Sequence, residues 1–258
     1  MLILLPASDA KAPVGHGRPV DLTRLSFARL GPTREAVLAA LVAASSAPDA
    51  LRRLGVGPSR LEQVRANVDV RDAPAAPAAA VYAGVLYGAL AWADLDPAAR
   101  RRARSWVVVV SALWGAVRAG DRIPPYRLDM CGRLPGLGHL PDVWRGPLGD
   151  VLPGAARRGL VVDCRSSDYL TAWRPSGELA ERTLLVRVVR GRDDARSPGS
   201  HRAKRARGVL VSRIVADALD PDRPEELVAE LAGALDVTVR PPDRPGRCWS
   251  LLVADPGD

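Results

Sequence analysis

The stretch WVVVVSALWG, residues 106–115, places four consecutive valines between apolar neighbours, a pattern typical of a strand buried on both faces. The stretches GLVVDCRSS at 159–167 and TLLVRVVRG at 183–191 have the same character, and residues 2–5 predict a short strand near the start of the chain. The apolar stretch beginning at Trp106 extends only to Val117, much less than the roughly 20 residues of a membrane-spanning helix. The sequence therefore predicts a buried central sheet.

Helical patterns alternate with these strands along the chain. Apolar residues at helical spacing predict a helix from Pro32 to Ala44 and another from His201 to Leu219. The stretch DAPAAPAAA at 72–80 is a linker or the lead-in to a helix, and the tail predicts a polar helix followed by strands at Val237–Val239 and Trp249–Val253. No repeat and no clear break divides the chain. We expect one compact α/β domain over residues 1–258, of the mixed α+β kind, with a central mixed sheet flanked by helices.

The composition is that of a basic globular protein. Of the 258 residues, 47% are hydrophobic and 26% are charged, which is ordinary for a folded domain. The 37 lysines and arginines outnumber the 29 aspartates and glutamates, and the net charge of +8 favours a polyanionic partner. The opening MLILLP is apolar but has no basic n-region, and Pro6 and Asp9 end it too early for a signal peptide. We therefore expect a cytoplasmic protein without a membrane segment.

Metal, disulfide and cofactor chemistry have little support in the sequence. Cys131, Cys164 and Cys248 lie far apart without a C-x-x-C motif, and the three histidines lack ligand spacing. The chain also has no Walker A loop, no G-x-S-x-G and no G-x-G-x-x-G after a strand. We expect no bound metal and no cofactor.

Only two of the basic residues are lysines, Lys11 and Lys204. Either they survive by chance in an arginine-rich composition, or they mark positions that need a compact ammonium group with a tunable pKa. A desolvated lysine can act as a nucleophile or as an acid–base group. A lysine–carboxylate site built from Lys11 and Lys204 with Asp9 and Asp168 is therefore one candidate catalytic site.

The segment LRRLGVGPSRLEQV at 51–64 places a glycine-rich turn between two helical patterns, as in a helix-hairpin-helix over about residues 48–66. Glycines in such a turn let the backbone approach a phosphate, and the second helix presents free N–H groups to it. The alternative is an ordinary corner in which a glycine ends the first helix. The candidate phosphate-binding residues here are Gly55, Val56, Gly57, Ser59 and Arg60.

The basic segment 190–213 is a second candidate anion site, with eight basic residues against two acidic ones. On a helix, His201, Lys204 and Gly208 share one face, and a glycine in mid-helix predicts a close neighbour or a ligand. The alternative is a solvated basic face. The eight bases are Arg190, Arg192, Arg196, Arg202, Lys204, Arg205, Arg207 and Arg213.

Two loops follow buried strands, where α/β folds place residues that contact ligands. In the second, DCRSSDY at 163–169, Arg165 and Ser166 are anion-binding candidates and Asp168 is a candidate base. The other loop, at 111–130, contains arginines, which suit phosphate, and a tyrosine, which suits a base or sugar. The alternative is that these residues form a buried ion-pair network that holds the loop. The residues of the first loop are Arg118, Asp121, Arg122, Tyr126, Arg127 and Asp129.

Taken together and in this order, several segments resemble the YaaA family of peroxide-stress proteins. They span nearly the whole chain and include both lysines. Many relatives read P-P-S-E-G-K at the first motif, where this chain has Ala7, Asp9 and Ala10 in place of Pro, Glu and Gly. The segments are PASDAK at 6–11, VYAGVLY at 81–87, SALWGAVR at 111–118, PYRLDM at 125–130, DCRSSDY at 163–169, and SHRAKRARG at 200–208 with Arg213.

The resemblance implies a compact α/β fold with a helix-hairpin-helix and a positively charged cleft. It also implies DNA binding and a role in limiting oxidative damage by keeping unincorporated iron low. The expected partner is duplex DNA, including bent or gapped duplexes, bound with little regard to sequence. One alternative is an enzyme acting on a nucleotide, a nucleoside or a damaged base through the lysine–carboxylate site, and another is a scaffold for an acidic protein. The expected cleft residues are Gly55–Ser59, Arg118, Arg127, Arg165, Lys204, Arg207 and Arg213.

Overall fold

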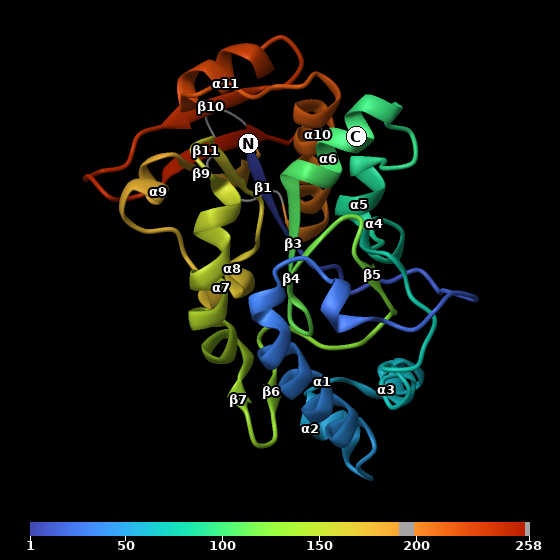
Figure 1. Ribbon diagram of the computed structural model, residues 1–258. Coiled ribbons are helices and arrows are strands. Elements are labelled where there is room, and N and C mark those ends of the chain that lie inside the picture. Colours follow the sequence, from blue (N-terminus) through green and yellow to red (C-terminus); the bar gives the residue numbers. More distant parts are fainter. Residues whose placement is uncertain (191–198, 256–258) are drawn as a thin grey trace.

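The computed structural model describes residues 1–190 and 199–255, and a seven-stranded sheet with the order β10-β11-β9-β8-β1-β3-β4 forms its centre (Figure 1). Two small ribbons accompany it, β2 (Ala76–Pro77) with β5 (Arg122–Ile123) and β6 (Arg133–Leu134) with β7 (Gly138–His139). The mixed α/β class with a central mixed sheet is thus confirmed. The strands of the large sheet are β1 (Leu2–Pro6), β3 (Val107–Ser111), β4 (Gly115–Arg118), β8 (Val161–Asp163), β9 (Thr183–Val189), β10 (Val237–Arg240) and β11 (Trp249–Ala254).

The inner strands of this sheet run parallel, from β11 through β9, β8 and β1 to β3, and the edge strands β10 and β4 are antiparallel to their neighbours. The chain first adds β3 on one side of β1 and later adds β8 on the other side. In an open α/β sheet, such a reversal opens a crevice at the carboxyl ends of the strands, where ligands bind. The topology therefore favours a site at the carboxyl end of β1.

Helices flank the sheet and extend beyond it at one end of the molecule (Figure 1). Short 3-10 turns occur at Leu22–Arg24, Ala28–Leu30 and Pro58–Arg60. Within the described residues, no helix has the length and apolar character needed to cross a membrane. The helices are α1 (Gly31–Ser45), α2 (Ala50–Leu54), α3 (Leu61–Ala66), α4 (Ala78–Val81), α5 (Val85–Leu90), α6 (Pro97–Trp106), α7 (Leu140–Ala156), α8 (Ser167–Ala172), α9 (Gly177–Glu181), α10 (Ser200–Ala216) and α11 (Pro224–Leu231).

Strand β3 is shorter than the apolar stretch that predicts it, because the chain turns back after Ser111 to form β4. The turn depends on Gly115, whose φ of 69° lies in the left-handed region. A Cβ atom at Gly115 would also collide with the ring of Trp144 in α7. From α1, the buried Arg34 donates hydrogen bonds of 2.9 Å and 2.7 Å to the carbonyls of Trp114 and Ala116 and so fixes the turn.

Helix α10 covers most of the predicted helix 201–219 and packs against α5 and α6. A Cβ atom at Gly208 would overlap the carbonyl oxygen of Leu86 and lie 3.0 Å from the backbone nitrogen of Leu90. The close neighbour expected at this mid-helix glycine is therefore helix α5 and not a ligand. Arg192 and Arg196 of the basic segment lie outside the described residues.

Residues 50–66 form two short helices joined by a tight turn, at the lower end of Figure 1. Gly55 has a φ of 64°, and its N–H donates to the carbonyl of Arg52 at 3.2 Å, which ends α2. Gly57 has a φ of −76°, a value that any residue adopts. The geometry at Gly55 is that of an ordinary helix end, so phosphate binding by this turn stays a prediction.

Candidate functional site at the carboxyl end of strand β1

The loop P-A-S-D-A-K leaves β1 at the point where the strand order reverses. Its first residue beyond the strand, Ala7, donates a backbone hydrogen bond of 2.9 Å to Val110 of β3. On the other side, Cys164 after β8 donates one of 2.8 Å to Leu4. The loops after β1 and β8 therefore begin side by side, as the topology predicts.

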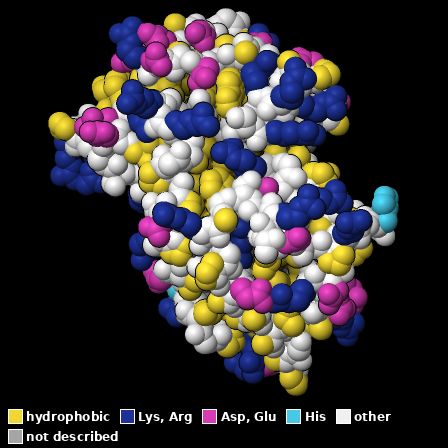
Figure 2. All heavy atoms as spheres, in the orientation of Figure 1, with side chains coloured by type: hydrophobic (Ala, Val, Ile, Leu, Met, Phe, Trp, Pro, Cys, Tyr) yellow, Lys and Arg dark blue, Asp and Glu magenta, His cyan; other side chains and the backbone are white. Residues whose placement is uncertain are grey.

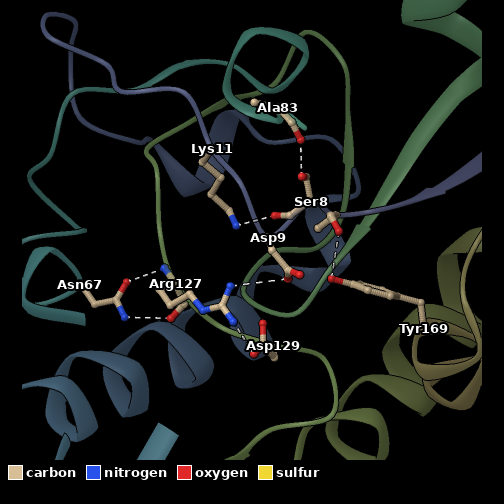
Figure 3. A network of polar contacts seen from close by, with 9 residues as sticks. Ser8, Asp9, Lys11, Asn67, Ala83, Arg127, Asp129 and Tyr169 are labelled. Carbon is tan, nitrogen blue, oxygen red and sulfur yellow. Dashed lines mark hydrogen bonds and ion pairs between the residues drawn. The ribbon is translucent and has the colours of Figure 1, made fainter. Parts of the chain in front are cut away.

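A short segment between α4 and α5 holds the loop in place. Ala12 donates to the carbonyl of Val81 at 2.9 Å, and Ala83 donates to that of Ala10 at 3.1 Å, so Lys11 pairs with Tyr82 as an isolated β-bridge. The hydroxyl of Ser8 also donates to the carbonyl of Ala83 (Figure 3). These bonds fix the backbone of Lys11, and with it the direction of the side chain.

The Lys11 ammonium group lies among aromatic rings. Nζ donates a hydrogen bond of 2.7 Å to the carbonyl of Ser8 and lies 4.2 Å from the ring centroid of Tyr126 and 5.9 Å from that of Tyr82. Burial lowers the pKa of Lys11 from 10.5 to about 8, and nearby Asp9 opposes this shift. A lysine with such a pKa is partly neutral near physiological pH, so its nitrogen can act as a base or a nucleophile.

All four tyrosines of the chain gather around this loop. Tyr87 donates to the carbonyl of Pro6 at 2.8 Å and Tyr169 donates to that of Ala7 at 3.3 Å. The hydroxyls of Tyr82 and Tyr126 lie 3.2 Å apart, and that of Tyr126 is 2.7 Å from Ser111 Oγ. Burial raises the pKa of Tyr82 to about 12, so its hydroxyl stays protonated. Tyr82 and Tyr126 thus place neutral rings beside Lys11, while Tyr87 and Tyr169 hold the start of the loop.

Arg127 faces the same space from the loop after β5 (Figure 3). The side-chain amide of Asn67 makes two hydrogen bonds of 2.8 Å with the backbone of Arg127. It donates one to the Arg127 carbonyl and accepts the other from the Arg127 N–H. The guanidinium contacts Asp129 at 2.7 Å and Asp9 at 3.6 Å, and the side chain is only 10% exposed. Within the described residues, Nε and Nη1 of Arg127 have no hydrogen-bond partner. A buried arginine with free donors is suited to a bound anion or polar ligand.

A cavity of about 380 Å³ opens in front of these residues. It brings together Asp9, Asp168, Ser166, Lys204 and Arg207, which come from the loop after β1, the start of α8 and helix α10. Lys11 is not part of this lining, and its amine lies near enough to Asp9, Arg127 and Asp129 for their charges to act on it (Figure 3). The other lining residues are Pro6, Ala7, Leu86, Asp129, Met130, Cys131, Tyr169 and Ser200.

A second feature is a groove along strands β9, β10 and β11, which we call the arginine groove. It consists of two cavities of about 470 and 500 Å³ that share several lining residues. Leu185 and Arg187 of β9 lie beside Ser250 and Leu252 of β11 on its floor. Arg207 lines both this groove and the cavity near β1, so the two adjoin. The arginines characteristic of the groove are Arg174, Arg187, Arg240, Arg244 and Arg247.

The arginine groove is strongly basic. These five of its lining arginines are exposed, and within the described part of the chain none of the five forms an ion pair. Asp243 and Asp163 are the carboxylates among the described lining residues, and Asp163 already pairs with Arg165. Figure 2 shows basic side chains over the part of the surface that contains β9–β11 and α10. The groove therefore offers several guanidinium groups to an anionic partner.

Comparison with known proteins places the chain in a family. The profile of the family described as peroxide stress protein YaaA matches residues 1–232. The chain belongs to this family. A UPF0246 protein of Streptomyces coelicolor is 44% identical over 256 residues, covering 98% of each chain. A UPF0246 protein of Corynebacterium efficiens is 39% identical over 243 residues, covering 93% of this chain and 94% of that protein. The resemblance drawn from the sequence motifs is confirmed.

The residues of the cleft expected from the YaaA resemblance do not all line one cavity in the structure. The turn at Gly55–Ser59, with Arg60, lines neither the cavity near β1 nor the arginine groove. Arg118 donates to the carbonyl of Ser105 and lies 5.5 Å from the ring of Phe27. Arg213 pairs with Asp217, the residue that caps the C-terminal end of α10. His201 is exposed near the start of α10.

Arg165 differs most from its predicted role as an anion-binding residue. Its side chain is 0% exposed, and its guanidinium makes bonds of 2.9 Å and 2.7 Å to the carboxylate of Asp163. The ring of Trp173 lies 5.3 Å from the guanidinium carbon. Asp163 neutralises the charge that the sequence offers to an anion, so Arg165 instead fixes the loop after β8.

The arginine groove is not evident from the sequence, because its residues are far apart along the chain. Arg174 follows α8, Arg187 lies in β9, and Arg240, Arg244 and Arg247 surround the turn between β10 and β11. Two features of the sequence point to it. Arg187 interrupts an otherwise apolar strand, and the stretch RPPDRPGR at 240–247 holds three arginines and one acidic residue.

Proposed function

We propose that this YaaA-family protein is a cytoplasmic DNA-binding protein of the peroxide-stress response, and that the arginine groove is its DNA-binding surface. Bound protein would help to limit iron-dependent oxidative damage. The observation that carries the proposal is a set of exposed arginines that form no ion pair with any described residue and that several segments of the chain contribute to one continuous groove. The family description supports the stress role.

The chemistry of the groove suits a phosphodiester backbone better than a single phosphate. Arginine forks bind phosphate oxygens at fixed geometry, and several along a groove can contact successive phosphates. Leu170, Leu185 and Pro241 lie between the arginines and supply apolar surface for sugars. Such contacts carry little sequence information, so binding is expected to be largely sequence-neutral and strongly salt-dependent.

The test is fluorescence anisotropy on intact, gapped and single-stranded DNA across a salt series. The double variant Arg187→Glu, Arg240→Glu is expected to weaken binding more than tenfold at low salt and to reduce the slope of log K against log salt by about 2. Arg101→Glu is the matched control, because Arg101 is an exposed arginine on α6 outside the groove. It is expected to change affinity less than threefold.

Three outcomes would contradict the proposal. If no DNA binds even at low salt, the function itself is wrong for this chain. If Gly57→Asp abolishes binding and the groove variant does not, DNA binds at the turn between α2 and α3 instead. If an acidic protein binds and DNA does not compete with it, the surface serves a protein partner.

A further inference from the structure

The amine of Lys11 contacts neutral groups directly and lies near charged side chains. In the described part of the chain, its one hydrogen bond goes to the carbonyl of Ser8, and no carboxylate lies within ion-pair distance of Nζ. The faces of Tyr82 and Tyr126 flank it. Asp9, Arg127 and Asp129 are the charged groups that act on it. The nitrogen is therefore fixed in position without being neutralised by a salt bridge.

Lys11 and the cavity near β1 can serve one ligand together. Asp9 and Asp129 both line the cavity and both approach Arg127 (Figure 3). Within the described residues, Nε and Nη1 of Arg127 have no hydrogen-bond partner, and Nη1 has only its long contact with Asp9. A ligand that displaced the long 3.6 Å contact between Arg127 and exposed Asp9 would reach from the cavity towards the amine. The carboxylates would then flank the reacting atoms.

The far wall of the cavity is basic. Lys204 and Arg207 project from α10, together with the hydroxyls of Ser200 on α10 and Ser166 on the loop after β8. In the described residues, Nε of Arg207 is buried without a hydrogen-bond partner. An ammonium, a guanidinium with a free N–H and two hydroxyls form a set of donors suited to a phosphate.

We propose that Lys11 forms an imine with a small phosphorylated aldehyde or ketone whose phosphate is bound by Lys204 and Arg207. This activity is separate from DNA binding in the arginine groove. Of the two lysines in the lysine–carboxylate site expected from the sequence, the proposal makes Lys11 the nucleophile and Lys204 a phosphate-binding residue.

The reaction is balanced within the site. The neutral Lys11 amine attacks the carbonyl carbon, a C–N bond forms, and the carbonyl π electrons move to oxygen. One carboxylate, Asp9 or Asp129, carries a first proton from nitrogen to the alkoxide oxygen, which gives the carbinolamine. It then carries the second N–H proton to the hydroxyl group of the carbinolamine. That group leaves as water and the C=N bond forms, so no oxidant or reductant is needed. Burial raises the pKa of Asp129, which suits a carboxyl group that carries a proton.

The chain is well suited to a direct test, because its amines are few. Besides Lys11 and Lys204 there is the terminal amine of Met1, which pairs with Asp220 at 2.9 Å. The probe is pyridoxal 5′-phosphate, a phosphorylated aldehyde, followed by borohydride reduction and peptide mapping. The variant Arg101→Lys adds a reference amine on the exposed face of α6.

Lys11 is expected to be labelled at least tenfold faster than the amine introduced by Arg101→Lys, with saturation as the probe concentration rises. Inorganic phosphate should compete, and pyridoxal without its phosphate should label Lys11 at least fivefold more slowly. Arg207→Gln should remove the advantage of the phosphorylated probe. Lys11→Arg should lose the label while it keeps the fold by circular dichroism, since arginine preserves the charge.

Labelling of Lys11 no faster than the reference amine would overturn the proposal, and so would labelling that does not saturate. Equal labelling by pyridoxal and its phosphate would overturn the phosphate-binding part. The outcome is separable from DNA binding, because Lys11→Arg is expected to leave anisotropy on DNA unchanged while it abolishes the imine.

Discussion

Nη1 of Arg127 lies 3.6 Å from Oδ1 of Asp9, and this contact joins the loop after β1 to the loop after β5. Its other partner, Asp129 at 2.7 Å, brings a second carboxylate to the same guanidinium. One buried arginine therefore keeps two carboxylates close together beside Lys11. Within the described residues, Nε and Nη1 of this guanidinium have no hydrogen-bond partner, although Nη1 keeps its longer contact with Asp9.

Replacing Arg127 by methionine should destabilise the protein by about 1–3 kcal/mol, since the substitution leaves Asp9 and Asp129 close together without their cation. The measurement is the urea midpoint and slope at pH 7.5. Arg52→Met is the control, because Arg52 is 81% exposed and its ion pair with Asp49 should contribute less than about 1 kcal/mol. An equal effect of the two substitutions would show that Arg127 does not hold these loops together.

The lowered pKa of Lys11 predicts a pH dependence of stability. Between pH 8 and 10.5 the unfolded chain holds a proton on Lys11 that the folded chain has lost, so stability rises with pH through this window. Relative to Lys11→Met, the wild type should gain stability from pH 8 to 10, at less than about 1.4 kcal/mol per pH unit. The groups facing the amine are Asp9, Arg127, Asp129, Tyr82 and Tyr126.

The measurement compares urea unfolding of the two proteins at several pH values, so that titration of the tyrosines largely cancels. Arg101→Met is the control and should show a constant difference from the wild type, because arginine does not titrate in this range. A constant difference for Lys11→Met as well would mean that the amine titrates alike in the folded and unfolded chain.

Much of the fold could be predicted because its strands and helices leave local patterns in the sequence. The valines of β3, the helix at α1 and the mid-helix glycine of α10 each carry a local signal. The pairing of Arg165 with Asp163 leaves no local signal in the sequence. The two residues are only two positions apart, but they bind each other firmly only when tertiary packing buries both side chains away from water. The arginine groove depends on strand order, which brings Arg187 and Arg240 to one surface, and strand order is not a local property.

The three cysteines are predicted to be poor sensors of peroxide, although the family is described by peroxide stress. Burial raises the pKa of Cys164 to about 12 and that of Cys248 to about 11, and it also raises the pKa of Cys131. Peroxide oxidises the thiolate, which these pKa values make scarce at pH 7.5. Thiol titration after peroxide addition should show loss no faster than that of free cysteine. Rapid loss of one thiol, abolished by Cys131→Ser, would contradict this.

Gly208→Ala tests the contact between α10 and α5. Helix propensity alone would make alanine stabilising by about 1 kcal/mol. The added Cβ would overlap the Leu86 carbonyl oxygen, which is backbone and cannot move aside, so we expect a loss of more than about 2 kcal/mol instead. Gly154→Ala in α7 is the control, because a Cβ there meets no atom within 4 Å, and it should be neutral or stabilising. Because Lys204 and Arg207 lie on the same helix, Gly208→Ala should also slow labelling of Lys11 by pyridoxal 5′-phosphate. If Gly208→Ala unfolds no more easily than Gly154→Ala, the two helices do not approach as closely as described, and the basic wall of the cavity must lie elsewhere.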